Sequence, residues 1–137
     1  MLIGISPLLT GELLHHLDEM GHSDSVVIAD AHFPSARLAR RFVDIPIEDL
    51  PTMVAMIRTV LPLDDCPAVD LMQSSTNEIE AVQLAALAAA GVEREDARML
   101  ERFAFYDLAR EAFLVVRTSE TRGYGNVILR KGIVTQG

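Results

Sequence analysis

Cysteine and aromatic residues are scarce in this sequence, and tryptophan is absent. The 137 residues include one cysteine, Cys66, and aromatic side chains make up 5% of the chain. A single cysteine excludes an internal disulfide and fits a reducing compartment. The neighbouring carboxylates of Asp64 and Asp65 disfavour a thiolate, so we expect no nucleophilic role for Cys66. With so few aromatic side chains, the interior must be built from Ala, Leu, Val and Ile, as in helices packed on a sheet.

The sequence also lacks long apolar runs and a basic leader. No stretch approaches the roughly 18 apolar residues that a membrane helix needs. Ser6, Pro7 and Gly11 interrupt the apolar residues near the start, which does not match a secretory signal. We therefore expect a cytoplasmic protein that does not insert into a membrane.

Basic residues are outnumbered by acidic ones. The chain has 12 Lys and Arg against 20 Asp and Glu, a net charge of −8, which argues against nucleic acid and anionic membranes as partners. Arg37, Arg40 and Arg41 have the spacing of one solvated helix face. The mean hydropathy of +0.24 is high for a monomer of this size, so we expect some apolar surface to be covered by a partner, such as another copy of the chain.

Strands alternate with helices along the chain. Ser6 and Pro7 form a start signal for the first helix, and Gly21 is a stop signal. Pro51 allows the third helix to begin at that residue. Helices are expected over residues 7–20, 35–42, 46–61, 77–90 and 105–111, and strands over 25–29, 68–73, 98–102, 112–118 and 126–130. This pattern predicts an α/β fold, a single layered domain over residues 1–137 with a mostly parallel sheet flanked by helices.

Ionisable residues gather between residues 21 and 34. His22, Asp24, Asp30 and His32 lie within eleven positions, and Asp30 follows an apolar strand. Ligands of open α/β sheets collect beyond the carboxyl ends of strands, so Asp30 is a candidate site residue. The spacing equally allows Asp30 to cap a turn and the histidines to be ordinary surface residues. A carboxylate–imidazole metal site is a further alternative, although no two-histidine helix spacing is present.

Two later segments combine polar and aromatic side chains. The first, residues 102–106, places Arg102 among Phe103, Phe105 and Tyr106, which is typical of a wall that binds sugars but is also explained by core packing. The second, residues 123–126, exposes a tyrosine between two glycines, and a tight hairpin explains it equally well.

Several motifs in fixed order carry a family resemblance. They are Ile5-Ser6-Pro7-Leu8, Glu19-Met20-Gly21-His22, Asp30-Ala31-His32-Phe33-Pro34, Arg102-Phe103-Ala104-Phe105-Tyr106, Tyr124-Gly125-Asn126 and Lys131-Gly132. With these motifs the sequence resembles the fucose mutarotase and ribose pyranase family over nearly its whole length. Ribose-type members carry Gly-Leu-Pro at residues 32–34 and lack the Phe-Ala-Phe-Tyr run, so the resemblance is to the fucose branch.

The resemblance implies roles for particular residues. His22 corresponds to the proton donor, and the sugar-binding residues correspond to Asp30, Arg102, Tyr124, Gly125 and Asn126. It implies an isomerase that needs no cofactor and no metal, with a small monosaccharide as substrate. Members resemble ring-shaped homo-oligomers, often decamers, with sites completed at subunit contacts.

The sequence departs from the family pattern in three places. Ser23 replaces the glycine that usually follows the histidine, Gly123 replaces a lysine, and residues 64–96 show little resemblance. These departures affect the choice of sugar and not the type of reaction. The reaction expected is interconversion of the α and β anomers of L-fucose or a related aldose by general acid–base ring opening. Three alternatives stay open: a D-ribose pyranase, a non-catalytic sugar-binding protein, and a metal-dependent hydrolase built on His22, Asp24 and His32.

Overall fold

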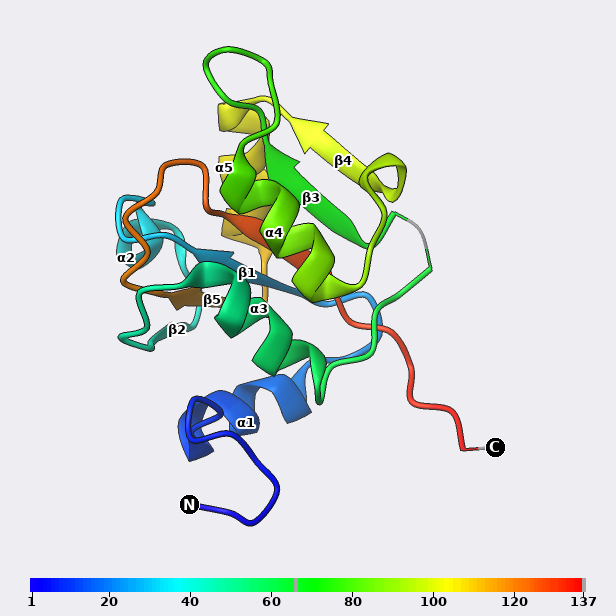
Figure 1. Ribbon diagram of the computed structural model, residues 1–137. Coiled ribbons are helices and arrows are strands. Elements are labelled where there is room, and N and C mark those ends of the chain that lie inside the picture. Colours follow the sequence, from blue (N-terminus) through cyan, green and yellow to red (C-terminus); the bar gives the residue numbers. More distant parts are fainter. Residues whose placement is uncertain (66, 137) are drawn as a thin grey trace.

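A six-stranded sheet forms the centre of the computed structural model, which describes residues 1–65 and 67–136 (Figure 1). The strand order is β2-β5-β1-β6-β3-β4. The strands are β1 (Ser25–Ala29), β2 (Phe42–Asp44), β3 (Val69–Met72), β4 (Ala97–Leu100), β5 (Leu114–Arg117) and β6 (Val127–Arg130). All neighbouring strands pair in parallel except β6, which runs antiparallel to both β1 and β3. The α/β fold with a mostly parallel sheet is confirmed, and Cys66 lies outside the described residues.

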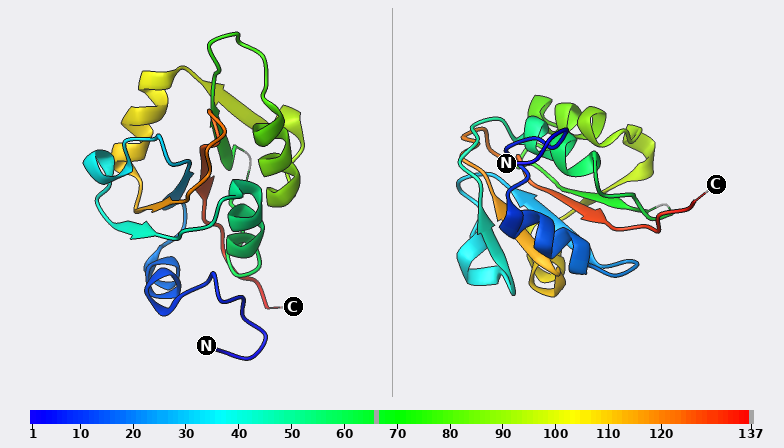
Figure 2. Two further views of the ribbon diagram at one scale, coloured as in Figure 1. Left: turned by 60° about the vertical axis from the view of Figure 1, so that its left-hand side comes forward. Right: turned by 90° about the horizontal axis from the view of Figure 1, so that it is seen from below.

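Helices cover both faces of this sheet (Figure 2). Helices α1 (Gly11–Glu19), α3 (Leu50–Arg58) and α4 (Ala81–Ala90) pack on one face, and α2 (Ser35–Leu38) and α5 (Arg102–Glu111) pack on the other. A strand covered on both faces favours apolar side chains on both, which explains why residues 26–29 of β1 are all apolar. None of the described helices has the length and apolar character needed to cross a membrane.

Helices α1 and α3 begin later than the first residue that the sequence predicted, because other residues cap them. Ser6 closes a separate turn by bonding the Leu8 N–H, and Thr10 caps α1 through the Leu13 N–H (3.2 Å). Asp49 caps α3 in the same way through the Thr52 N–H (3.0 Å), with Pro51 in its first turn. When two residues that favour helix caps lie close together, the sequence alone does not show which one caps the helix, since the side chain of each can accept a free helix N–H.

Two strand assignments also differ from the prediction. Residues 35–42 were expected to be helical, but α2 ends at Leu38 and residues 42–44 form β2 beside β5. Arg102 was expected in a strand and instead begins α5, because the Glu101 carboxylate accepts the N–H groups of Phe103 and Ala104 and caps the helix there. Both strands are only three or four residues long, too short for a reliable alternation pattern.

The topology sorts the loops onto two edges of the sheet. The carboxyl ends of the five mutually aligned strands share one edge with the start of β6, and their amino ends share the other with the end of β6. Residues 22, 64 and 131 therefore lie at the amino edge, and residues 30, 75, 102 and 124 lie at the carboxyl edge.

One charged residue lies inside the sheet. Asp70 on β3 is fully buried and accepts hydrogen bonds from Arg98 on β4 (2.7 Å) and Arg130 on β6 (2.6 Å). The two guanidinium groups supply the compensation that a buried carboxylate requires.

Replacing Asp70 with alanine should lower the free energy of unfolding by about 3 kcal/mol, because two arginines would lose the carboxylate they pack against. The exposed pair Asp107–Arg110 provides the control, since Asp107→Ala should cost less than about 1 kcal/mol. Urea denaturation of both variants measures the difference, and equal losses would contradict the compensating role assigned to this trio.

Candidate functional site

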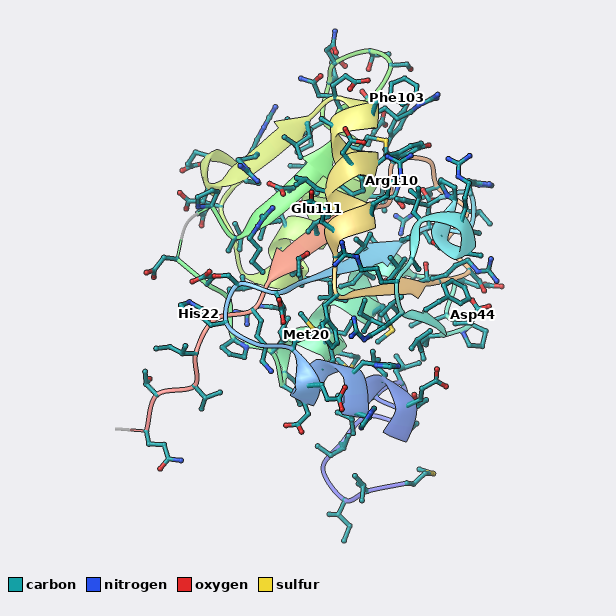
Figure 3. All side chains as sticks on the ribbon, turned by 180° about the vertical axis from the view of Figure 1, so that it is seen from behind. Met20, His22, Asp44, Phe103, Arg110 and Glu111 are labelled. Atoms are coloured by element: carbon teal, nitrogen blue, oxygen red, sulfur yellow. The ribbon has the colours of Figure 1, made fainter. Side chains whose placement is uncertain are left out.

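His22 lies at the amino edge, in the turn between α1 and β1 (Figure 3). Its side chain is 58% exposed, and its Nε2 lies 2.9 Å from Oδ1 of Asp64, 42 residues away in sequence. Ser23 adopts a φ of +72°, a backbone conformation that favours glycine, and its hydroxyl donates to the other oxygen of Asp64 (2.7 Å). Ser23, which departs from the family pattern, therefore adopts a backbone conformation typical of glycine, and its hydroxyl bonds to Asp64, the partner of His22.

The Asp64 carboxylate is held in its charged form. Hydrogen bonds from the Ser23 hydroxyl, the His22 ring and the Asp65 N–H lower the pKa of Asp64 to about 2. A charged carboxylate can only accept hydrogen bonds, so Nε2 of His22 must carry the hydrogen that it shares with Asp64. In the tautomer that carries this hydrogen, the lone pair of the imidazole is on Nδ1.

The Lys131-Gly132 motif positions both members of this pair. The Lys131 ammonium donates to the carbonyl oxygens of Leu17 and Met20 at the end of α1 (2.7 Å each), where cations stabilise a helix. The Lys131 carbonyl accepts the N–H of Ser23 (2.8 Å). A Cβ at residue 132 would overlap the carbonyl of Leu63, so only glycine allows the Asp64 segment to lie this close.

At the carboxyl edge, Asp30 organises two loops. It is 2% exposed, and its Oδ1 accepts the N–H groups of His32 and Phe33 (2.9 Å each). Its Oδ2 accepts the N–H of Gly125 and the side-chain amide of Asn126 (3.2 Å each), while the Asp30 N–H donates to the Asn126 oxygen. The expected sugar-binding roles of Asp30, Gly125 and Asn126 stay predictions, and the geometry makes these residues a hydrogen-bonded support for the loop that carries Tyr124.

Tyr124 and Arg102 line the same cavity, about 350 Å³ in volume, with Phe103 and Ser75 among the other lining residues. This volume is within the range typical of small-molecule sites, ~300–1,000 Å³. The Tyr124 hydroxyl accepts the N–H of Ser75 (3.0 Å), which fixes the ring and leaves the hydroxyl hydrogen free to donate. The left-handed residue of this turn is Tyr124 itself, with a φ of +63°.

The loop behind Tyr124 is tied down by a buried carboxylate. Burial alone would raise the pKa of Glu120, but hydrogen bonds from Arg122 and from the Leu50 N–H outweigh it and lower this pKa to about 2. A Cβ at Gly125 would lie 3.2 Å from Glu120 Cγ and from the Arg122 carbonyl, so this turn packs tightly against its support. The strained tyrosine conformation is held from several sides, as in many functional sites.

The Arg102–Tyr106 cluster divides between core and surface. Phe105 is fully buried in the core, whereas Arg102 and Phe103 are exposed. The Arg102 guanidinium lies over the Phe103 ring, 4.7 Å from its centroid, and no hydrogen-bond partner is found for it among residues 1–65 and 67–136. Core packing is confirmed for Phe105 and is wrong for Phe103, and the sugar-binding wall stays a prediction.

One chain does not bring His22 and the cavity together. Figure 3 shows His22 well apart from Phe103. Strand β1, which separates the two edges, alone spans roughly 17 Å. Asp24 and His32 are also apart, since Asp24 bonds the Gly21 N–H and the His32 ring bonds the Thr121 carbonyl oxygen. Within the described part of the chain, no three His, Cys, Asp or Glu side chains are grouped so that they could hold a metal ion.

Sequence reasoning missed Asp64 and Ser75. Both contact a predicted site residue through a bond that joins distant parts of the chain, and both lie in the segment with little family resemblance. The motif glycine at residue 132 was the one available signal for Asp64, because a glycine after a strand can mark close backbone approach.

Known proteins resemble this chain over its length. The profile of the RbsD / FucU transport protein family matches residues 3–134. An L-fucose mutarotase of Glaesserella parasuis serovar 5 (strain SH0165) is 37% identical over 140 residues, which cover 97% of this chain and 96% of that protein.

Two solved structures extend the comparison to the fold. The fucose mutarotase in complex with L-fucose from Streptococcus pneumoniae has a TM-score of 0.89 and 31% identity, over 98% of this chain and 100% of that one. Bacillus subtilis RbsD complexed with D-ribose has a TM-score of 0.80 over 98% and 100% of the two chains, and at 21% identity it shares the fold. Profile, identity and fold agree over nearly all of the sequence, and the chain therefore belongs to the RbsD / FucU transport protein family, a family of sugar mutarotases and pyranases.

Proposed function

We propose that the chain is a cytoplasmic aldose mutarotase of the fucose type, which interconverts the α and β anomers of L-fucose or a closely related free aldose. The observation that carries this proposal is the His22–Asp64 pair, an exposed imidazole whose Nε2 is held at 2.9 Å by a carboxylate. Its other nitrogen is left to exchange protons, and mutarotation needs only such exchange. The relatives of 37% and 31% identity support fucose as the first sugar to test.

The reaction opens and recloses the sugar ring. A base removes the proton of the anomeric hydroxyl while an acid protonates the ring oxygen, and the bond between C1 and the ring oxygen breaks. The resulting aldehyde turns about the C1–C2 bond, and the ring closes again on its other face with both protons returned. Each positioned acid or base contributes typically about 10²–10⁴-fold to such a step. Because nothing is oxidised and no group is transferred, we propose neither cofactor nor metal.

His22 is the proposed acid–base residue, and the cavity residues are the proposed sugar ligands. Arg102 offers guanidinium donors, and Tyr124 offers a hydroxyl already oriented by Ser75. Asp30, Gly125 and Asn126 hold the Tyr124 loop from behind. In this arrangement the proton transfer and the sugar recognition come from different edges of the sheet.

A site assembled from two copies of the chain follows from this separation. We propose a homo-oligomer, a decameric ring with sites at subunit contacts, in which His22 of one copy faces the cavity of the next. Apolar side chains at both ends of the chain are exposed and available for such contacts, among them Met1, Leu2, Ile3, Ile133 and Val134. An isolated copy would hold only half of each site.

His22→Ala should reduce the acceleration of anomer exchange by about 10²-fold or more, because the acid–base group is lost. Saturation-transfer NMR with free L-fucose, D-galactose and D-ribose measures exchange directly and also separates mutarotase from pyranase activity. His15→Ala, which removes an exposed histidine of α1, is the matched control and should leave exchange unchanged. Wild-type protein that binds these sugars without accelerating any exchange would overturn the proposal in favour of a sugar-binding protein.

Two inactive variants should complement each other if the site is shared. His22→Ala and Arg102→Ala, co-expressed with different tags and purified on both, should regain about a quarter of the wild-type activity, since random neighbours build intact sites at that frequency. Arg102 has no hydrogen-bond partner among the described residues, so its removal should leave the fold intact. Mixed assemblies no more active than either parent would place the whole site within one copy.

Ser23→Gly should raise the pKa of Asp64 from about 2 toward its ordinary value, because the hydroxyl bond is the largest contribution to the lowering. Glycine accepts the φ of +72° without strain, so only the bond is removed. Since the folded-state pKa is depressed, the stability this carboxylate contributes is present above pH ~4 and is lost as pH falls through about 2. A ¹³C NMR titration of the Asp64 carboxyl checks this, and an unchanged midpoint would contradict it.

A further inference from the structure

Phe103 is exposed although phenylalanine is an apolar residue. It is 59% exposed, whereas the other four phenylalanines, all within the described part of the chain, are buried or half-buried. It lies in the first turn of α5, where its N–H donates to the Glu101 carboxylate (2.9 Å). Arg102 lies over its ring and Tyr106 meets it edge-on, with centroids 5.9 Å apart. The ring is thus held in place while much of its surface stays open.

Phe103 is one of the residues that line the cavity of Arg102 and Tyr124. The other side of that cavity is a polar turn, residues 74–78, closed by the Asn77 N–H to the Ser74 carbonyl (3.0 Å) and by the Ser74 hydroxyl to the Glu78 carbonyl (2.6 Å). Asn77 has a φ of +60°, which fixes the shape of the turn. Phe103 is therefore an apolar patch in a cavity whose other lining residues are polar.

A sugar that fits such a cavity must itself be polar with one apolar patch. A 6-deoxy aldose has this character, since its ring carries hydroxyl groups and its C5 carries a methyl group. A methyl group packed against the ring of Phe103 would be removed from water, which is favourable. A hydroxymethyl group in the same place would bury a hydroxyl without a hydrogen-bond partner, which is unfavourable. We propose that Phe103 is a specificity-determining residue that contacts this methyl group and selects 6-deoxy sugars. The proposal rests on the proposed function, because it takes the cavity to be the sugar site.

Three sugars isolate the contribution of the methyl group. L-Fucose, L-galactose and D-arabinose share the configuration of their ring hydroxyls as pyranoses, and their C5 carries methyl, hydroxymethyl and hydrogen respectively. The wild-type protein should accelerate exchange of L-fucose about 10-fold or more over D-arabinose, the effect typical of one methyl group in an apolar pocket. Phe103→Ala should lower the L-fucose rate about 10-fold more than the D-arabinose rate, so that the two rates become similar.

Leu84→Ala is the matched control, because it truncates an exposed apolar residue of α4 outside this cavity. It should leave the preference among the three sugars unchanged. Circular dichroism and the mass of the assembly should be the same for both variants and the wild type, since both side chains are exposed. Equal losses for all three sugars in Phe103→Ala, or a changed assembly mass with the preference retained, would overturn the proposal.

A binding measurement separates this inference from the proposed reaction. Saturation-transfer-difference NMR should show strong transfer to the methyl protons of L-fucose in the wild type and a several-fold weaker transfer in Phe103→Ala. That result without any exchange would support Phe103 as the methyl-binding residue while refuting mutarotase activity. Methyl transfer that is the same in both proteins would refute the role of Phe103 whatever the activity.

Discussion

Helices on both faces of the sheet confine polar chemistry to its edges. Every strand interior in the centre of the sheet is buried, so an ionisable side chain there needs full compensation, as Asp70 has from its two arginines. Side chains that must meet water and substrate can lie only where strands end. The distance between the two edges is then set by strand length, which is why His22 and the cavity of Tyr124 are separated within one copy.

The antiparallel strand β6 connects these two edges. Its start follows Tyr124-Gly125-Asn126 and its end leads into Lys131-Gly132. Four residues of strand therefore separate the loop that carries Tyr124 from the residues that support His22. Because β6 lies between β1 and β3, it fixes both edges against the centre of the sheet. The two halves of the proposed site are thereby joined through one strand in the centre of the sheet.

The sequence predicted the central strands and helices better than the first residues of the helices or the contacts between distant parts of the chain. The buried strand β1 and the Gly91 end of α4 follow from local pattern, since both depend on neighbouring residues. The start of α1 did not, because Ser6 and Thr10 are both good caps and tertiary packing chooses between them. The His22–Asp64 bond could not be predicted, because it joins residues 42 positions apart through a turn whose shape depends on Gly132. The family resemblance identified candidate sugar-binding residues. The structure adds that both carboxylate oxygens of Asp30 accept hydrogen bonds from backbone N–H groups and the Asn126 amide.

The Asp70 trio has a consequence for how the strands find their partners. Arg98 lies directly opposite Asp70 on β4, and Arg130 lies diagonally on β6, so both arginines share its face of the sheet. A slip of one residue in either neighbour would turn its arginine to the opposite face and leave the carboxylate short of a partner in the interior. Apolar strands of this kind otherwise tolerate misalignment, since one valine packs much like another. The trio therefore fixes the register of β3 with its two neighbours, because strand pairings shifted by one residue would leave Asp70 short of a partner and be less stable.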